Sequence, residues 1–303
     1  MKLGFLSAIL PDLTFEEVVD FASETGYEAI EVACWPHGKA ERRYGGVTHI
    51  DVDNLTDDRI KEIKEYCSKN NIEISALAYY PNNMDEDLEK RSFYNEHLLK
   101  VIDAASRLGV NLVNTFIGRM TSKNLEKNFE ELNKVWEPIL SYANHKGIKI
   151  GIENCPMIFT YDEWPGGQNL GSSPYNFRRI FEQLDYENIG INFDPSHHII
   201  QDMEYENFFH NFKDRIFHLH FKDMKIDKEK LNEYGRLVPP NYYTIPKIPG
   251  HGDVDWAKFI SSASEIGFNG YAIVEIEDRS YEGSLDDRKN SLRISYRYLR
   301  TLM

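Results

Sequence analysis

The sequence predicts an α/β fold, a single (β/α)8 TIM barrel over residues 1–303 with long insertions in its βα-loops. Short β-rich runs alternate with longer helical patterns as far as the C-terminus. No low-complexity linker divides the chain, and 303 residues is an ordinary length for one such barrel. A doubly wound open sheet is the alternative, but eight strand–helix units in this length favour closure.

Eight β-rich runs bounded by turn residues are the candidate strands. They cover residues 3–8, 29–34, 73–80, 112–118, 149–154, 189–194, 216–223 and 271–278. Between them, apolar residues recur at helical spacing. Helices are expected over residues 14–26, 56–71, 84–109 and 125–147.

The helix expected over 14–26 illustrates how the boundaries are set. Thr14 is a favourable N-cap, and Gly26 is a favourable residue at the C-terminal end. A similar lead-in of glycine followed by a strand recurs as GYEAIEV, GVNLVNT, GIKIGIE and GFNGYAIVE. This recurrence indicates repeated helix–strand units, which a parallel barrel requires.

Three long insertions follow strands, over residues 35–54, 156–176 and 224–255. Loops that follow the strands lie on the C-terminal face of a barrel, where active sites are built. The sequence therefore places its aromatic and glycine-rich insertions on the face expected to carry the function.

The composition argues against several classes of protein. The chain has 49 acidic and 35 basic residues and a net charge of −14, with the basic residues scattered, whereas duplex-binding proteins cluster Lys and Arg against phosphates. No apolar run approaches the length of a membrane span, and Pro11 and Asp12 interrupt the N-terminal apolar stretch, so no signal peptide is expected. The odd number and wide spacing of Cys34, Cys67 and Cys155 indicate reduced thiols and a cytoplasmic location.

Strand alternation separates apolar from polar side chains in the last four expected strands. In residues 149–154, for example, Ile150 and Ile152 share one face and are expected to pack against the helices. The polar residues of the opposite face then point into the barrel mouth. They are Glu153, Asp194, His220 and Glu275.

These four side chains come from the fifth to the eighth expected strands. Three carboxylates in a mouth of low dielectric constant raise one another's pKa values unless a cation lies among them. Taken singly, each residue could equally be a solvated strand end paired with Lys or Arg. The four together predict a site for one divalent metal ion.

Five motifs occur in order along the chain: GIEN, FDPSHH, HLHFKD, PGHGDVDW and VEIED. With these motifs the sequence resembles the xylose isomerase-like barrel superfamily. Within it, the sequence is similar to the sugar phosphate isomerase/epimerase group, which includes ketose 3-epimerases, inosose dehydratases and zinc-dependent apurinic-site endonucleases. The resemblance covers nearly the whole chain and is strong for the fold and the metal site.

Carried over residue by residue, the resemblance implies that Glu153, Asp194, His220 and Glu275 are the metal ligands. It implies that Glu153 and Glu275 also flank the sugar and exchange its proton on opposite faces, as the catalytic acid–base pair. The D-x-x-H motif of the family matches Asp194 and His197, so His197 is expected to contact the substrate. His198 is expected to pack, and His218 to lie one layer deeper in the barrel.

One imidazole and three carboxylates make a fairly hard site, for which Mn²⁺ is preferred and Mg²⁺, Co²⁺ and Zn²⁺ are alternatives. Such an ion can chelate a carbonyl and an adjacent hydroxyl, and stabilise the enediolate formed when the α-proton leaves. The leading hypothesis is therefore a metal-dependent isomerase or epimerase of a keto sugar or keto polyol.

A dehydratase or lyase acting on a keto-inositol or a 3-keto-glycoside is the main alternative. It would use the same enolate but needs an additional acid, for which His251 and His197 are candidates. Lys222 and Asp223 follow the strand-seven histidine where ketose epimerases carry an Arg, and this HFKD segment resembles inosose dehydratases. An endonuclease is a minor alternative, because the third and fourth strands lack the extra histidines of that branch. A non-catalytic sugar-binding barrel is disfavoured by the acid–base pair.

The expected substrate-binding residues are His197, Trp35, His251 and Lys222. Trp35 could stack on a sugar face or be a buried aromatic residue, and His251 could contact substrate or order its loop. The expected partner is a small carbohydrate, with no nucleic acid and no membrane. The sequence leaves the oligomeric state open, with a homo-dimer or a homo-tetramer as the possibilities.

Two further features of the insertions bear on substrate size and charge. Trp164 lies in a glycine-rich segment that could close over the site. Arg42 and Arg43 could reach a phosphate, but paired exposed arginines are more often solvated. The sequence contains no glycine-rich phosphate-binding strand–turn–helix, so a sugar without a phosphate is favoured.

Overall fold

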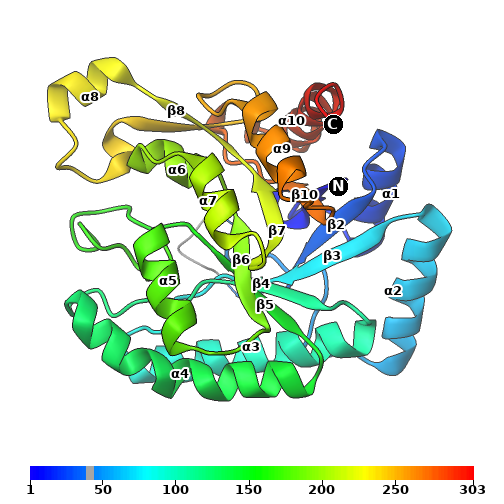
Figure 1. The fold of residues 1–303 in the computed structure, drawn as a ribbon. Helices are drawn as coiled ribbons and strands as arrows, with labels where there is room; N and C mark the ends of the chain where they lie inside the picture. Colours follow the sequence, from blue (N-terminus) through cyan, green and yellow to red (C-terminus); the bar gives the residue numbers. More distant parts are fainter. Residues whose placement is uncertain (39–43) are drawn as a thin grey trace.

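The computed structural model describes residues 1–38 and 44–303. Parallel strands close into a barrel, and helices surround it (Figure 1). The barrel strands are β1 (Lys2–Leu6), β2 (Ala29–Ala33), β3 (Glu73–Ala78), β4 (Leu112–Thr115), β5 (Lys149–Glu153), β6 (Ile189–Phe193), β7 (Ile216–Phe221) and β10 (Tyr271–Val274). They follow one another in chain order, and β10 pairs with β1 to close the barrel. The predicted fold class is confirmed.

The helices lie where the sequence pattern predicts them, with additional short helices in the second half of the chain. α1 begins after a capping box between Thr14 and Glu17 and ends at Gly26, whose φ of 97° is left-handed. The α-helices are α1 (Phe15–Thr25), α2 (Asp57–Asn70), α3 (Leu88–Leu108), α4 (Leu125–His145), α5 (Pro174–Gln183), α6 (Ser196–Gln201), α7 (Tyr205–Phe212), α8 (Lys228–Tyr234), α9 (Trp256–Glu265) and α10 (Leu285–Arg300). The 3₁₀ helices are η1 (Ser7–Ile9), η2 (Pro240–Tyr242) and η3 (Arg279–Tyr281).

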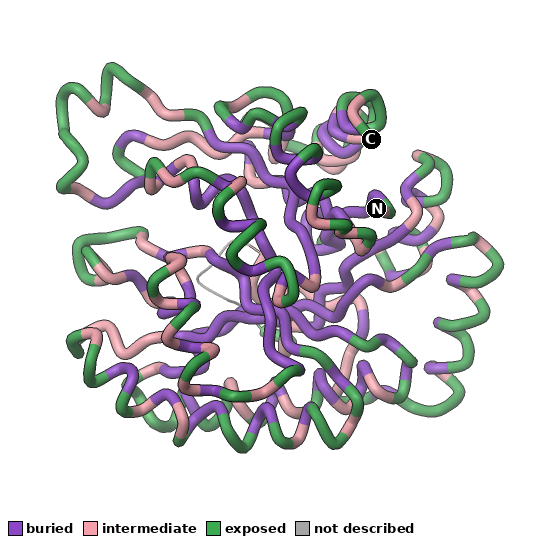
Figure 2. The backbone as a smooth tube through the Cα atoms, viewed as in Figure 1, coloured by how far each residue is buried: buried purple, intermediate pink, exposed green. Residues whose placement is uncertain are grey.

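The large apolar residues of the strands pack outward against these helices. Ile150 and Ile152 of β5 are fully buried in the main hydrophobic cluster. The ring of Phe193 on β6 lies 4.4 Å from that of Phe208 on α7 and 5.5 Å from that of Phe259 on α9, between centroids. Buried segments run along the barrel strands, and exposed ones follow the outer sides of the helices (Figure 2). The inner face of the strands is thus left to polar and small side chains.

The insertion over 224–255 contains secondary structure that the sequence pattern did not predict. β8 (Asp223–Ile226) and β9 (Thr244–Lys247) form an antiparallel hairpin that carries α8 and η2. Figure 1 shows this insertion extending away from the barrel. Each strand has four residues, and β9 contains Pro246, so neither shows the alternation that identifies a strand.

Asp223 anchors the base of this insertion. Its buried carboxylate accepts hydrogen bonds from the backbone N–H groups of Gly250, Gly252 and Val254 and from the indole of Trp256, at 2.9 to 3.1 Å. The PGHGDVDW motif is therefore held by its backbone and its tryptophan.

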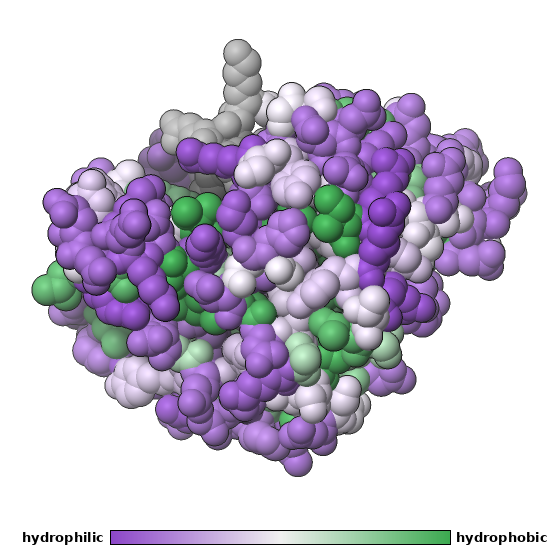
Figure 3. Space-filling view, turned by 90° about the horizontal axis from the view of Figure 1, so that it is seen from above, coloured by the Kyte–Doolittle hydropathy of each residue, from purple (hydrophilic) through white to green (hydrophobic). Residues whose placement is uncertain are grey.

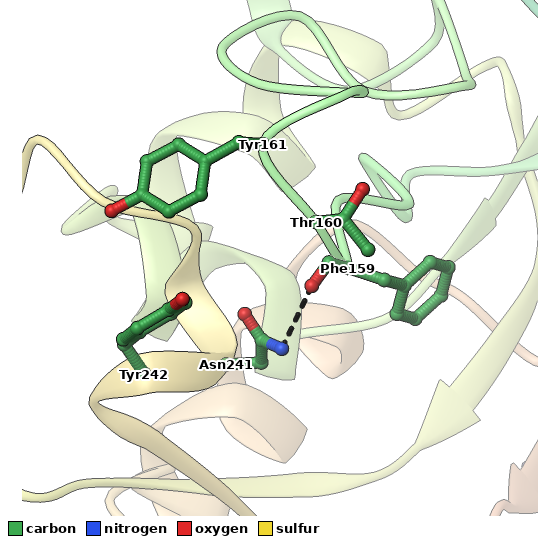
Figure 4. Close-up of a pocket in the computed structure, with 5 residues that line it drawn as sticks. All are labelled: Phe159, Thr160, Tyr161, Asn241 and Tyr242. Atoms are coloured by element: carbon green, nitrogen blue, oxygen red, sulfur yellow. Dashed lines mark hydrogen bonds between the residues drawn. The ribbon is translucent and has the colours of Figure 1, made fainter.

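The insertions that follow β5 and β7 touch each other. Asn241 donates a hydrogen bond of 2.8 Å to the carbonyl oxygen of Phe159. The rings of Tyr161 and Tyr242 lie 5.8 Å apart, edge to face. Together with Thr160, these residues line a hollow of about 370 Å³ (Figure 4). The contact joins two segments that are distant in sequence.

The surface and the cysteines agree with the composition. Viewed from above, one face of the molecule is mostly hydrophilic, with hydrophobic side chains in separate patches (Figure 3). Within residues 1–38 and 44–303, no helix is long and apolar enough to cross a membrane. Cys34, Cys67 and Cys155 are free thiols. Arg42 and Arg43 lie outside the described residues.

Candidate functional site

Four strand ends bring Glu153, Asp194, His220 and Glu275 together inside the barrel mouth. Glu153 ends β5, Asp194 follows β6, His220 lies in β7, and Glu275 follows β10. One potential ligand atom from each lies within 4.8 Å of those of the other three. All four are buried, with exposed fractions from 0 to 7%. The convergence expected from strand alternation is therefore present.

The carboxyl groups of this cluster differ in their affinity for protons. Burial and repulsion from Glu275 raise the pKa of Glu153. Burial also acts to raise the pKa of Glu275, but attraction to Lys222 and His220 outweighs it and lowers the value to about 2. For Asp194, burial is likewise outweighed by attraction to His197 and Lys222, and the pKa falls well below its ordinary value. Opposed shifts of this kind are typical of sites where carboxylates have different tasks.

Lys222 places its ammonium among the carboxylates. Nζ lies 3.2 Å from Oδ2 of Asp194, 3.1 Å from Oε2 of Glu275 and 3.3 Å from Oε2 of Glu277. Burial acts to lower the pKa of Lys222, but the surrounding carboxylates hold it well above the ordinary value. Lys222 sits between the end of β7 and the start of β8, where the chain leaves the barrel. Glu277 was not among the predicted site residues.

The turn after β6 places His197 beside the same carboxylates. Its Nε2 lies 3.2 Å from Oε1 of Glu153 and 3.2 Å from Oδ2 of Asp194. The other oxygen of Asp194 accepts a hydrogen bond of 2.8 Å from the backbone N–H of Ser196. The segment DPSH thus begins α6 in a way that turns its histidine into the barrel mouth.

Two asparagines hold the strand ends in position. Asn154 donates a hydrogen bond to the backbone oxygen of Asp194 (2.9 Å) and accepts one from its N–H (2.7 Å). Asn169 donates to the carbonyl oxygens of Glu153 and Cys155, each at 2.8 Å. Asn154, the last residue of the GIEN motif, therefore positions Asp194 at the end of the next strand, β6.

His198 and His218 lie where the sequence places them. His198 is buried, with ring centroids 4.8 Å from both Phe193 and Phe208. Burial lowers its pKa to about 3, and a neutral ring packed between aromatics has a structural role. His218 lies deeper in the barrel, with Nε2 3.1 Å from Oγ of Ser75.

Trp35 and His251 differ in their relation to the site. Trp35 is half-buried, and its ring centroid lies 5.9 Å from that of Tyr80, whose hydroxyl contacts His220. His251 lies on an exposed turn, where its backbone N–H donates to the carbonyl oxygen of Ile248. Among the described residues, no hydrogen bond or ion pair joins the His251 side chain to the four clustered residues. The structure brings Trp35 close to the cluster and leaves His251 apart from it.

Glu31 is a site residue that the sequence reasoning missed. It lies on β2, fully buried, with Oε2 2.6 Å from Nε2 of His220. The signal was present in the sequence, because Ala29 and Ala33 share its strand face while Ile30 and Val32 pack outward in the main hydrophobic cluster.

The cluster has the donors that a divalent cation requires. Oδ2 of Asp194 and Nδ1 of His220 are buried and lie 3.0 to 3.2 Å from charged groups, but neither forms a hydrogen bond of regular geometry with the part of the chain that is described. Buried polar atoms are nearly always hydrogen-bonded, and such exceptions call for an explanation. Four carboxyl groups, including Glu277, share the single ammonium of Lys222. An additional cation among the four clustered residues would use both atoms and balance the charge, so these residues fit a metal ion.

A family model described as "Xylose isomerase-like TIM barrel" matches residues 19–302. Among curated proteins, YfiH of Bacillus subtilis, an uncharacterised protein, is 24% identical over 92% of this chain and 93% of its own length. Inosose dehydratase of Lacticaseibacillus casei is 20% identical over 91% of this chain and 87% of its own length.

Solved structures share the fold at low sequence identity. The IolI protein with a bound zinc atom superposes with a TM-score of 0.73 at 17% identity, over 100% of this chain and 99% of its own. The 3-keto-D-glucoside 4-epimerase YcjR from E. coli superposes with a TM-score of 0.71 at 17% identity, over 99% of both chains. At these identities the similarity shows a shared fold.

Proposed function

The chain belongs to the xylose isomerase-like TIM barrel family, and from this premise we propose that it is a divalent-metal-dependent isomerase or epimerase. Its substrate would be a keto sugar or keto polyol that reacts through an enediolate. The observation that carries the proposal is the buried cluster itself: Glu153 and Glu275 stand with Asp194 and His220 around one small volume. This arrangement joins two potential proton-transfer groups to a cation site.

The similar proteins support a carbohydrate substrate and a divalent cation. YcjR is an epimerase of a keto-glucoside, and the IolI protein binds zinc. The donor set of one imidazole and three carboxylates favours Mn²⁺ and also accommodates Mg²⁺, Co²⁺ or Zn²⁺. When bound, the ion would supply positive charge that polarises the substrate carbonyl and stabilises the enediolate.

The two glutamates have distinct proton-transfer roles in this proposal. Glu275, held ionised by the ammonium of Lys222, is the group that accepts the α-proton of the substrate. Glu153, whose pKa is raised, holds a proton more readily and delivers one to the opposite face. The hydrogen bond from Nε2 of His197 to Oε1 of Glu153 orients that carboxyl group.

Three further residues are proposed to bind the substrate. His197 lies beside both Glu153 and Asp194, so its N–H can reach an oxygen of a sugar held there. Lys222 balances the carboxylates and can donate to a substrate hydroxyl. Trp35, next to Tyr80, offers an aromatic surface to the sugar ring.

Exchange of the substrate α-proton with deuterated water tests the proposal. With a panel of keto sugars and keto polyols and added Mn²⁺, Glu153→Gln and Glu275→Gln should each reduce exchange by at least about 100-fold, because each removes a proton-transfer group. Glu182→Gln on the exposed side of α5 serves as the matched control and should exchange like wild type. Wild-type exchange in both site variants would contradict the proposal.

A dehydratase or lyase is the second candidate, favoured by the similarity to the Lacticaseibacillus casei inosose dehydratase. It would remove the same α-proton but expel a β-substituent. The mass of the product separates the two candidates. Loss of water or of an aglycone identifies elimination, whereas an unchanged mass identifies isomerisation or epimerisation.

A further inference from the structure

We propose that Glu31 is a positioning residue that fixes the imidazole of His220, so that Nδ1 is presented to the metal centre. The inference rests on the proposed metal centre and adds to it a residue outside the four-ligand cluster. Glu31 comes from β2, whereas the cluster comes from β5, β6, β7 and the residue after β10. It reaches His220 from another side of the barrel.

The contact between the two side chains selects one tautomer of the imidazole. Oε2 of Glu31 lies 2.6 Å from Nε2 of His220, and both side chains are fully buried. In a neutral imidazole one nitrogen carries a proton, and the one bonded to a carboxylate is the donor. Nε2–H therefore donates to Glu31, so the nitrogen that can give up its proton to a metal ion is Nδ1, which lies beside Glu275.

Nδ1 is the atom that faces the other proposed ligands. It lies 3.0 Å from Oε2 of Glu275 and 3.8 Å from Oε2 of Glu153. Nδ1 forms no hydrogen bond of regular geometry with the described residues, so the carboxylates of these two glutamates are its polar neighbours. A carboxylate behind a metal-binding histidine fixes both its tautomer and its ring orientation, and it makes the ligand more basic. The geometry around His220 matches this arrangement.

Glu31 is itself held rigidly by side chains across the barrel interior. Its Oε1 accepts hydrogen bonds from the hydroxyl of Tyr80 at 2.6 Å and from Nδ2 of Asn114 at 3.1 Å. The Tyr80 hydroxyl in turn accepts a hydrogen bond of 3.1 Å from Nδ2 of Asn192. Both oxygens of the buried carboxylate are thus satisfied, and the carboxylate is fixed before His220 binds anything.

Glu31, His218 and His220 are close enough to suggest a second metal site, but their bonding argues against one. Nε2 of His220 and Oε2 of Glu31 already bond to each other. Nδ1 of His218 lies 3.9 Å from Glu31 and only 3.0 Å from Oδ1 of Asn192, and its Nε2 bonds to Ser75. These groups satisfy one another, so they form a support beneath the metal centre.

Metal affinity of the Glu31→Gln variant tests the inference. Titration of the chelator-treated protein with Co²⁺, followed by calorimetry and by the visible absorption of the bound ion, should show a Kd about 10- to 100-fold higher than that of wild type. Ser75→Ala is the matched control, because it removes a hydrogen bond to His218 in the same buried network without touching His220. Its Kd should stay within about twofold of the wild-type value, since the groups behind His220 are intact.

A measurement on the wild-type protein decides the matter if Glu31→Gln fails to fold. Nitrogen-15 NMR of histidine-labelled protein loaded with Zn²⁺ should show His220 protonated at Nε2 and bound to the metal through Nδ1. Protonation at Nδ1, or a wild-type Kd in a folded Glu31→Gln variant, would overturn the inference and leave the proposed metal centre standing. A wild-type protein that binds neither Co²⁺ nor Zn²⁺ would overturn both.

Discussion

At the scale of single residues, Lys222 stands out because three carboxylates surround one buried ammonium. One ammonium lies within 3.3 Å of the carboxylates of Asp194, Glu275 and Glu277. The side chain is 4% exposed, so water screens these contacts little. Removing one partner of a buried ion pair leaves charges uncompensated, which costs more stability than the intact pair contributes.

The stability of Lys222→Met measures this balance. In the presence of a chelator, denaturant unfolding should show a loss of about 3–5 kcal/mol relative to wild type, because buried carboxylates are left without a cation. Mn²⁺ should stabilise the variant more than it stabilises wild type, since the ion restores part of the missing charge. Lys225→Met, at an exposed position on β8, is the control. Equal stabilities of the two variants in chelator would show that Lys222 does not carry this role.

Side-chain direction could be predicted from the sequence for residues on strands, where alternation applies, and could not be predicted for residues in turns. Strand alternation predicted the direction of Glu153 and His220, and the structure places both in the barrel mouth. The same rule applies to Glu31, but no motif drew attention to β2. His251 lies in a turn, where no period relates sequence position to side-chain direction, and there the sequence could not indicate its exposure.

At the scale of elements, close approach between β4 and β5 shapes the side-chain network behind the proposed metal site. A Cβ at Gly151 would lie 2.2 Å from Oδ1 of Asn114. Asn114 in turn bonds to Glu31 and contacts His218. The glycine therefore leaves room for the side chain that connects the two layers of the barrel interior.

Gly151→Ala should push Asn114 away from Glu31 and destabilise the protein by about 1–3 kcal/mol, the usual cost of overpacking. It should also weaken Co²⁺ binding, because Glu31 loses a donor. Gly283→Ala, at an exposed position before α10, should change stability by less than about 0.5 kcal/mol. Chemical denaturation and Co²⁺ titration check both effects, and unchanged values for Gly151→Ala would refute the packing argument.

The packing of α6 against β6 makes stability depend on pH. Burial of His198 lowers its pKa to about 3 in the folded protein, against about 6.5 in the unfolded chain. Between these pH values the unfolded chain binds more protons than the folded protein does. The contribution of His198 to the free energy of unfolding is therefore complete above pH 6.5 and declines as the pH falls towards 3.

His198→Asn should therefore flatten the acid side of the stability profile. The loss of free energy of unfolding between pH 7 and pH 4 should be roughly 3 kcal/mol smaller in the variant than in wild type. The variant loses ring packing at every pH, so the comparison concerns the slope of the profile. Denaturant titrations at several pH values supply it, and parallel profiles would rule out a neutral, buried His198.

Elements were predictable to the extent that they repeat a regular period. The barrel strands and long helices do, and their bounds differ from the expected ones by a few residues. The strand expected over 271–278 ends at Val274, although the backbone N–H of Glu275 still donates to the carbonyl oxygen of Phe221 on β7. The β8–β9 hairpin is held by Asp223 and by cross-strand pairing, neither of which has a local pattern.

At the scale of the whole molecule, closure of the barrel is what assembles the site. β10 pairs with both β1 and β7, so the ends of β5, β6, β7 and β10 converge on one mouth. The fold class was predictable because the alternation of strands and helices is spread over the whole chain. The contact between Asn241 and Phe159, by contrast, joins two irregular insertions, and the sequence of neither insertion has a pattern that predicts it.

The central claim is that Glu153, Asp194, His220 and Glu275 hold a divalent cation. Crystals soaked in Mn²⁺ and measured near the manganese absorption edge test it directly. An anomalous peak bounded by these four side chains, with Nδ1 of His220 turned towards it, is the predicted result. A map without a peak there, in which Nδ1 of His220 and Oδ2 of Asp194 bond only to protein groups, would contradict the claim.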